Sequence, residues 1–158
     1  MHLVIRMEND ILVIIPTYNE SQNIPRLLER LMAIKPEVDV LIVDDGSPDG
    51  TADLVKDAEK RYPGRIHLIE RKGKLGLGSA YVRGFRFALE MGYIYICEMD
   101  ADFSHNPDDV PKLVEKVMSG EADVAVGSRY SNGISIVNWP LRRLILSYCA
   151  NLYARFIT

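Results

Sequence analysis

The chain has 158 residues, of which 47% are hydrophobic and 26% are charged, and its formal net charge is −3. This is the composition of an ordinary globular protein, and a domain of this length buries roughly two-thirds of its unfolded surface. The small acidic balance and the lack of a basic block exclude nucleic acid as an expected partner. The longest apolar runs, ILVII and YIYIC, are far too short to span a bilayer.

Apolar runs of strand length alternate with helical patterns along the chain. After a leader of residues 1–10, runs rich in β-branched residues occupy 11–15, 38–43, 66–70, 93–97 and 123–127. They are nearly continuous in hydrophobicity, as strands of a parallel sheet covered on both faces should be. Between them, apolar residues recur at helical spacing over 21–34, 51–62, 77–91 and 111–118. The alternation predicts an α/β fold with a mostly parallel open sheet flanked by helices.

A single domain over residues 1–158 is predicted, because no repeat, low-complexity stretch or linker divides the chain. After residue 127, a loop rich in Gly, Ser and Asn at 131–138 precedes a stretch of helical apolar spacing that begins at Trp139. The chain stops inside this stretch, so we expect the domain to be truncated at its C-terminus. Cys97 and Cys149 lack metal-binding spacing and are expected to be reduced core thiols.

Polar segments follow every predicted strand, at the edge where open α/β sheets bind their ligands. In chain order they are PTYNE (16–20), DDGSPDGT (44–51), RKGKLGLGSAY (71–81), DADFSH (100–105) and GSRY (127–130). Four of the five carry groups suited to a nucleotide diphosphate. Their convergence at one edge indicates a nucleotide site more strongly than any single motif does.

Some of these residues have a purely structural explanation. Glu20 and Ser21 can start a helix, Pro48, Asp49 and Gly50 can form a turn, and Thr51 can cap the next helix. The GLG at 76–78 follows the third strand and lacks the third glycine of a dinucleotide fingerprint. A tight loop that opens a helix is therefore favoured there.

Three charged residues are not explained by a turn. Asp44 and Asp45 follow a buried run, and one of them is expected to accept hydrogen bonds from a base or a ribose. Arg129 follows the run 123–127 directly, where it can meet a phosphate or an acidic cluster.

Asp100 and Asp102 are the residues of the sequence that most directly indicate a function. Two carboxylates this close repel each other and resist desolvation, so a pair at the end of a strand calls for a reason. Mg²⁺ or Mn²⁺ supplies one, because these cations prefer oxygen ligands and take substrate phosphates as further ligands. A solvated turn is the alternative, and we favour the metal.

The five segments together resemble the inverting glycosyltransferases of the GT-A fold, and within them the dolichol-phosphate (polyprenol-phosphate) mannosyltransferases. The similarity extends from about Ile11 to the end of the chain. DDGSPDGT, DADFSHNP and the segment WPLRR at 139–143 favour the mannosyltransferases over other members.

The resemblance implies specific roles for residues at the strand ends. The nucleoside would be held by five residues, and the diphosphate, ribose and metal by the DAD segment. Ser104 would be a further metal ligand, Arg129 would bind donor phosphate or sugar as a catalytic residue, and Arg143 would bind the acceptor phosphate. The implied donor-binding residues are Pro16, Tyr18, Glu20, Val43, Asp45, Asp100, Ala101, Asp102 and Arg129, with Asp100, Asp102 and Ser104 as metal ligands and Asp100, Asp102 and Arg129 as catalytic residues.

The resemblance also implies a reaction. GDP-mannose would be the donor, Mg²⁺ or Mn²⁺ the cofactor and a polyprenol phosphate the acceptor, at the cytoplasmic face of a membrane. Three alternatives stay open: a UDP-glucose-dependent or other glycosyltransferase of the same family, a nucleotidyltransferase and a non-catalytic nucleotide-sugar binding module. PTYNE in place of a Gly-rich, Arg-containing loop argues against the nucleotidyltransferase.

The stretch from Trp139 to Phe156 carries apolar residues at helical spacing beside Arg142, Arg143 and Arg155. Such a helix suits peripheral contact with an anionic membrane surface, since apolar area and basic charge both favour binding. Packing of the apolar stripe on the domain core is the equally weighted alternative.

Overall fold

The computed structural model describes residues 10–127 and Tyr153. The chain divides into two compact units at Ala125, and the elements described here belong to the first, Met1–Ala125. In chain order they are β1 (Ile11–Thr17), α1 (Ile24–Met32), β2 (Asp39–Asp44), α2 (Thr51–Arg61), β3 (Ile66–Glu70), α3 (Leu77–Met91), β4 (Tyr95–Glu98), the 3-10 helix η1 (Pro107–Asp109) and α4 (Val110–Met118).

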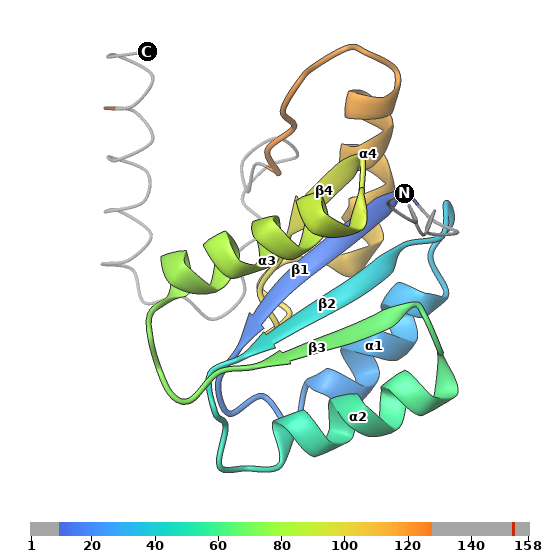
Figure 1. Ribbon diagram of the computed structural model, residues 1–158. Coiled ribbons are helices and arrows are strands. Elements are labelled where there is room, and N and C mark those ends of the chain that lie inside the picture. Colours follow the sequence, from blue (N-terminus) through green and yellow to red (C-terminus); the bar gives the residue numbers. More distant parts are fainter. Residues whose placement is uncertain (1–9, 128–152, 154–158) are drawn as a thin grey trace, which may run out of the picture. The chain divides into compact units, whose positions relative to one another are not determined.

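The four strands form one parallel sheet in the order β3-β2-β1-β4 (Figure 1). The predicted parallel sheet is thus confirmed for the first four strands. β4 begins at Tyr95 rather than at residue 93, because the Tyr93 N–H still bonds the Ala88 carbonyl at the end of α3, at 3.0 Å.

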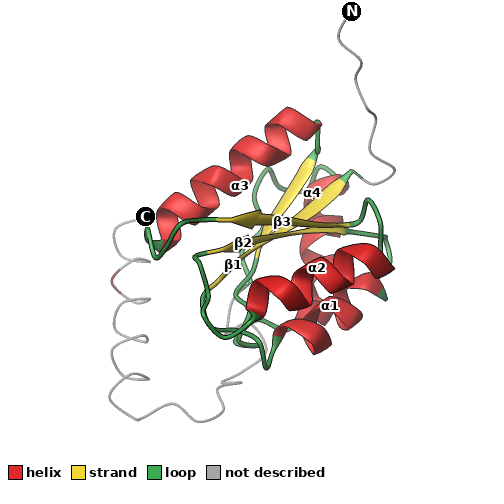
Figure 2. Ribbon diagram, turned by 60° about the horizontal axis from the view of Figure 1, so that its bottom comes forward, coloured by secondary structure: helices red, strands yellow, loops and turns green. Residues whose placement is uncertain are grey.

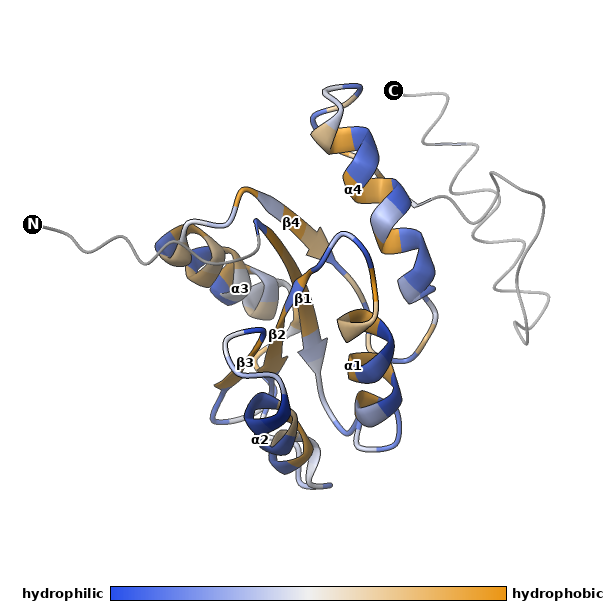
Figure 3. Cartoon of the chain, turned by 90° about the vertical axis from the view of Figure 1, so that its right-hand side faces the viewer, coloured by the Kyte–Doolittle hydropathy of each residue, from blue (hydrophilic) through white to orange (hydrophobic). Residues whose placement is uncertain are grey.

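Helices cover both faces of the sheet, with α3 on one face and α1 and α2 on the other (Figure 2). Alternate residues of β1 explain this: Leu12 and Ile14 pack in the cluster under α3, whereas Val13 and Ile15 pack in the cluster with α1. Successive side chains of a strand point to opposite faces, so a strand covered on both must be apolar throughout. Figure 3 shows the strands as largely hydrophobic and the helices as striped.

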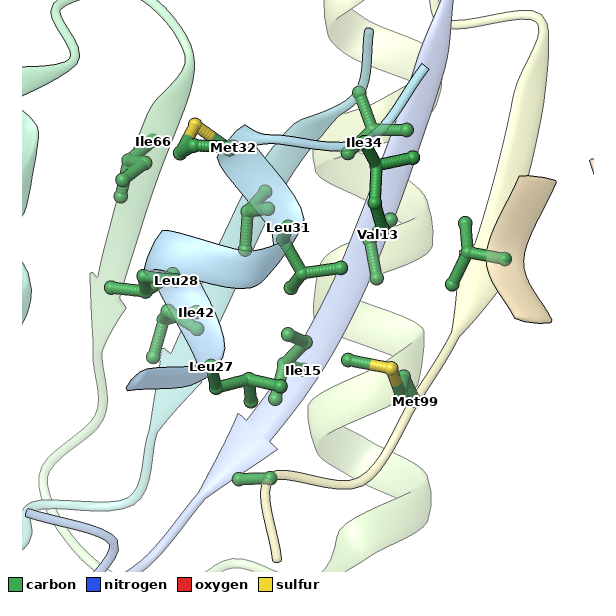
Figure 4. Packing of buried hydrophobic residues seen from close by; sticks show 14 of the residues in the cluster. Val13, Ile15, Leu27, Leu28, Leu31, Met32, Ile34, Ile42, Ile66 and Met99 are labelled. Atoms are coloured by element: carbon green, nitrogen blue, oxygen red, sulfur yellow. The ribbon is translucent and has the colours of Figure 1, made fainter. Parts of the chain in front are cut away.

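Helix α1 owes its position to an apolar stripe. Leu27, Leu28 and Leu31 are all buried, and Leu27 and Leu31 lie over β1 near Ile15 and Val13 (Figure 4). A fully buried leucine contributes about 1.5–3 kcal/mol relative to an exposed one. This stripe therefore fixes the start of α1, and with it the loop that joins β1 to α1.

Gly84 permits the close approach of α3 to the sheet. A Cβ atom at this position would lie 2.5 Å from Cγ2 of Ile14, closer than packed atoms allow. A larger residue would force either the Ile14 side chain or the helix to shift.

The prediction of a strand over 123–127 is wrong. These residues form no strand ladder in the described part of the chain, and Val124 and Val126 are 76% and 82% exposed. A β-branched pattern makes a strand only where a neighbouring strand offers hydrogen bonds and a face to cover, and the described residues offer 123–127 neither.

The amino edge of the sheet is sealed by a buried polar cluster. The Tyr93 hydroxyl donates to Oδ2 of Asp39 at 2.9 Å and lies 3.3 Å from Nε2 of His67, and Arg65 Nε lies 3.8 Å from Oδ1 of Asp39. Burial raises the pKa of Tyr93 and lowers that of His67, so both are neutral at pH 7.

Two further sequence expectations concern single features. Cys97 is an unpaired, partly buried thiol, and its burial raises its pKa to about 11, so it is protonated at neutral pH. Cys149 lies outside the described residues. Among those residues, no helix has the length and apolarity needed to cross a membrane.

Candidate functional site

The loops after the four strands meet at the carboxyl edge of the sheet, as predicted. Backbone hydrogen bonds continue past the strand ends and tie neighbouring loops together: Asp45 N to Thr17 O at 3.0 Å, Arg71 N to Asp44 O at 2.8 Å, and Met99 N to Ile14 O at 3.1 Å. The backbone therefore places all four loops in one row, and the side chains on them form the candidate site.

Asp44 organises the turn after β2. It is 1% exposed and accepts hydrogen bonds from Thr17 Oγ1 at 2.9 Å, Ser47 N at 2.8 Å and Ser47 Oγ at 2.6 Å. The expectation that no turn explains this aspartate is therefore wrong. Its carboxylate already accepts hydrogen bonds from these internal donors, so Asp45 is the remaining candidate of the pair to bind a base or a ribose.

The turn after β2 also holds the loop after β1. Backbone N–H groups of Asn19, Glu20 and Ser21 donate in turn to Ser47 Oγ, Thr51 Oγ1 and Asp49 Oδ2, at 2.9–3.0 Å. Hydrogen bonds from Thr51, and then from Ser21, hold the pKa of Asp49 far below its usual range despite the opposing effect of burial. The predicted turn at 48–50 is confirmed, but the predicted cap is wrong, because Thr51 is the first residue of α2 and no side chain caps the helix at Gly50. The turn holds the backbone of Glu20, one of the predicted donor-binding residues.

Asp45 forms an ion pair with Arg71, the first residue after β3, and both side chains are almost fully buried. Its second carboxylate oxygen accepts from Leu75 N at 3.2 Å. Arg71 also donates to Ser79 Oγ at 2.6 Å, so the pair ties β2 to the loop before α3. The sequence analysis missed Arg71. Its position directly after the run at 66–70, which was correctly predicted to be a strand, was the available signal.

Tyr18 and Lys74 face each other across the site. The Lys74 ammonium lies 4.5 Å from the centre of the Tyr18 ring, within cation–π range. Pro16 is half-buried, while the Val43 side chain is fully buried in the cluster under α3, so only its backbone is available to a nucleoside.

Asp100 and Asp102 remain open to solvent at the end of β4. The Asp100 side chain is 43% exposed and lies 3.8 Å from Nε2 of His105, while Ala101 between the two aspartates is buried. Partial burial favours a higher pKa for Asp102, but hydrogen bonds from Ser104 and the nearby His105 outweigh it, and the pKa is lowered. Asp102 is therefore ionised at neutral pH.

The backbone around the two aspartates is unusual. Phe103 has a φ of +59°, a left-handed conformation that bulky residues rarely adopt, and its ring lies under Arg26 of α1 at 5.1 Å. Asn19, in the loop after β1, has a φ of +60°. Asparagine adopts this conformation readily, so the strain is at Phe103, and strained residues of this kind gather at functional sites.

The residues at the end of β4 suit a divalent cation that is shared with a substrate. Within residues 10–127, no group of three or more His, Cys, Asp or Glu side chains could hold a metal. Two carboxylates with Ser104 nearby form an oxygen-only set, and Mg²⁺ is commonly held by one or two carboxylates together with substrate phosphates. The donor set fits such an ion.

Two predicted phosphate ligands, Arg129 and Arg143, lie outside the described residues. An open pocket of about 550 Å³ lies between the loop after β1 and the turn after β2. Asp45, Asp100 and Asp102 do not line it. Its lining residues are Asn19, Ser21, Gln22, Asn23, Pro48 and Asp49.

Comparison with known proteins identifies relatives of this chain. The chain is 49% identical over 146 residues to a polyprenol monophosphomannose synthase from Mycolicibacterium smegmatis, covering 92% of this chain and 55% of the relative. It is 47% identical over 147 residues to an undecaprenyl-phosphate mannosyltransferase from Micrococcus luteus, covering 93% of this chain and 59% of the relative. The chain thus spans little more than half the length of these curated relatives.

The fold is shared with glycosyltransferases of the GT-A type. Residues 1–349 of TarS from S. aureus superimpose with a TM-score of 0.54 at 24% identity, over 72% of this chain and 34% of that 1–349 fragment. The sequence model of the family described as "Glycosyl transferase family 2" matches residues 12–157. The chain therefore belongs to glycosyl transferase family 2.

Proposed function

We propose that this protein transfers mannose from GDP-mannose to a polyprenol phosphate, with inversion and with the help of Mg²⁺ or Mn²⁺, at the cytoplasmic face of a membrane. The observation that carries the proposal is the pair Asp100 and Asp102, ionisable and open at the carboxyl edge of the sheet. Relatives named for polyprenol- and undecaprenyl-phosphate mannosyl transfer support the choice of sugar and acceptor.

The described residues divide into two groups in this proposal. Tyr18, Glu20 and Asp45 line the end of the site suited to the nucleoside, on loops fixed by the turn after β2. Asp100 and Asp102 lie at the end suited to the diphosphate and metal, with Ser104 beside them. A bound divalent cation would supply positive charge against the diphosphate leaving group.

The acceptor chemistry makes few demands on the protein. A phosphate monoester is anionic at neutral pH, so its attack on the anomeric carbon needs no general base. The protein has to align acceptor and donor and to compensate charge, and we assign the donor phosphate to Arg129 and the acceptor phosphate to Arg143. A single displacement from an α-linked donor gives a β-linked product.

Calorimetric titration with GDP, in the presence of Mn²⁺ and in EDTA, tests the donor half of the proposal. Asp102→Asn should weaken GDP binding in Mn²⁺ at least about tenfold, because a charged ligand is lost, while the fold is retained. Asp53→Asn, on the exposed surface of α2, is the matched control and should bind as the wild type does. Equal GDP affinity for Asp102→Asn and wild type would remove the metal assignment.

A transfer assay tests the rest. Labelled GDP-mannose and UDP-glucose are offered separately, each with a polyprenol phosphate, and the lipid-linked sugar is counted. Transfer from UDP-glucose alone would assign the other donor. Nucleotide-sugar binding without transfer from either would indicate a binding module.

A further inference from the structure

The loop between β3 and α3, together with the first residue of α3, exposes two leucines beside two lysines. Leu75 and Leu77 are 66% and 59% exposed, and Lys72 and Lys74 are exposed as well. We name these four residues the β3–α3 loop surface. These residues form a small apolar patch flanked by basic charge, and contiguous apolar patches rimmed by polar residues mark interaction sites.

The loop is held in this shape from within. Asp45 pairs with Arg71 at its start and accepts from Leu75 N. Ser79 Oγ lies 2.9 Å from the carbonyl oxygen of Leu75 and 2.7 Å from that of Gly76, so its single proton is shared between these two acceptors. A fraying loop would make none of these bonds. The two leucines are therefore presented outward by a fixed backbone.

The charge of this region differs from that of the whole chain. Between Lys72 and Met91 there are four basic side chains and one acidic one, whereas the chain carries −3 overall. Neither Lys72 nor Lys74 forms an ion pair within residues 10–127, where Lys74 instead lies over the Tyr18 ring. The β3–α3 loop surface lies at the carboxyl edge of the sheet, to which the strand arrows point in Figure 1.

We propose that the β3–α3 loop surface docks onto an anionic lipid surface beside the donor site. The proposal rests on the proposed polyprenol-phosphate acceptor. The phosphate of this lipid must reach the carboxyl edge, so the membrane headgroups would lie next to that edge. Exposed leucines enter the interface and flanking lysines meet anionic headgroups, the combination that favours peripheral binding. Two leucines are far too little area for a stable protein–protein interface.

Sedimentation of the full chain with vesicles tests this surface. The vesicles are phosphatidylcholine alone or phosphatidylcholine mixed with phosphatidylglycerol. Wild type should bind the mixed vesicles, and Leu75→Ser with Leu77→Ser should lower partitioning about tenfold or more. Lys72→Gln should lower it about fivefold, on the anionic vesicles only.

The matched control uses the opposite edge of the sheet. Leu89 and Ile94 are 74% and 64% exposed at the far end of α3, and Leu89→Ser with Ile94→Ser should change partitioning less than about twofold. Equal losses in the two double variants, or wild type that stays in solution with the anionic vesicles, would overturn the proposal. A wild-type dimer that the loop substitutions dissociate would make the occupant a second copy of the chain and would also overturn it.

GDP titration in Mn²⁺ separates this inference from the proposed function. The double loop variant should bind GDP as the wild type does, because neither leucine side chain is assigned to the donor. Wild type that binds vesicles but not GDP would refute the proposed donor and leave the lipid surface standing.

Discussion

Asp39 at the amino edge of the sheet and Asp100 at the carboxyl edge differ sharply in their exposure to solvent. Asp39 at the amino edge is 1% exposed and is enclosed by Tyr93 and Arg65, whereas the Asp100 side chain at the carboxyl edge is 43% exposed. A buried carboxylate needs internal donors for the protein to fold, while a carboxylate left open at a strand end is free for a ligand. The comparison distinguishes Asp39, which internal groups enclose, from Asp100, which stays open to solvent.

The largest expected effect is a loss of stability caused by a substitution at the amino edge. Asp39→Ala removes the acceptor of the Tyr93 hydroxyl and the carboxylate beside Arg65, and should lower the free energy of unfolding by about 2–3 kcal/mol. Urea denaturation measures the change. Asp100→Ala at the open edge is the matched substitution, and a loss within about 0.5 kcal/mol is expected there. A similar loss at both edges would remove the distinction.

Asp45 lies between the two cases, because it is buried at the carboxyl edge and paired with Arg71. Asp45→Ala should weaken GDP binding by about 1.5–3 kcal/mol, as expected for the loss of a buried hydrogen-bonding carboxylate. Calorimetric titration of Asp45→Ala and Arg71→Ala with GDP tests whether Asp45 itself contacts the nucleoside. A larger loss for Asp45→Ala indicates direct contact with the nucleoside, and unchanged GDP affinity for Asp45→Ala rules that contact out.

The strained backbone beside Asp102 gives a smaller effect. A β-branched residue resists the left-handed conformation of Phe103, whereas asparagine accepts it. Phe103→Val should therefore be less stable than Phe103→Asn by about 1–2 kcal/mol. Both variants lose the ring under Arg26, so thermal or urea unfolding of the two isolates the backbone contribution. Equal stabilities would show that the loop does not hold this conformation in solution.

The smallest effect is the pH dependence at the amino edge. Burial lowers the pKa of His67 in the folded protein, so the unfolded chain binds the proton more readily. This contribution to stability is complete above the unfolded pKa of about 6.5 and is lost as the pH falls through the lower, folded pKa. Urea midpoints measured between pH 7.5 and about 5 should fall, and His67→Gln should lessen the slope. An unaltered slope in that variant would place the titrating group elsewhere.

Much of the fold could be predicted from apolar patterns because burial on two faces leaves a direct trace in the sequence. The run at 66–70 and the helix at 77–91 have the bounds that were predicted, and the other three described strands differ by at most two residues at either end. Helix α1 was predicted from residue 21 and begins at Ile24, because the Asn23 and Ile24 N–H groups close a turn on the Glu20 carbonyl.

The sequence by itself determined the alternation of strands and helices, the edge at which the polar loops meet and the pair Asp100 and Asp102. These follow from local periodicity and from chain order, which a parallel sheet converts into position. Only the tertiary structure decided that Asp44 accepts hydrogen bonds from Thr17 and Ser47 and that Asp45 pairs with Arg71. It also decided that 123–127 forms no strand among the described residues. Each of these depends on which groups from distant parts of the chain come within hydrogen-bonding distance, and residue type alone carries no record of that.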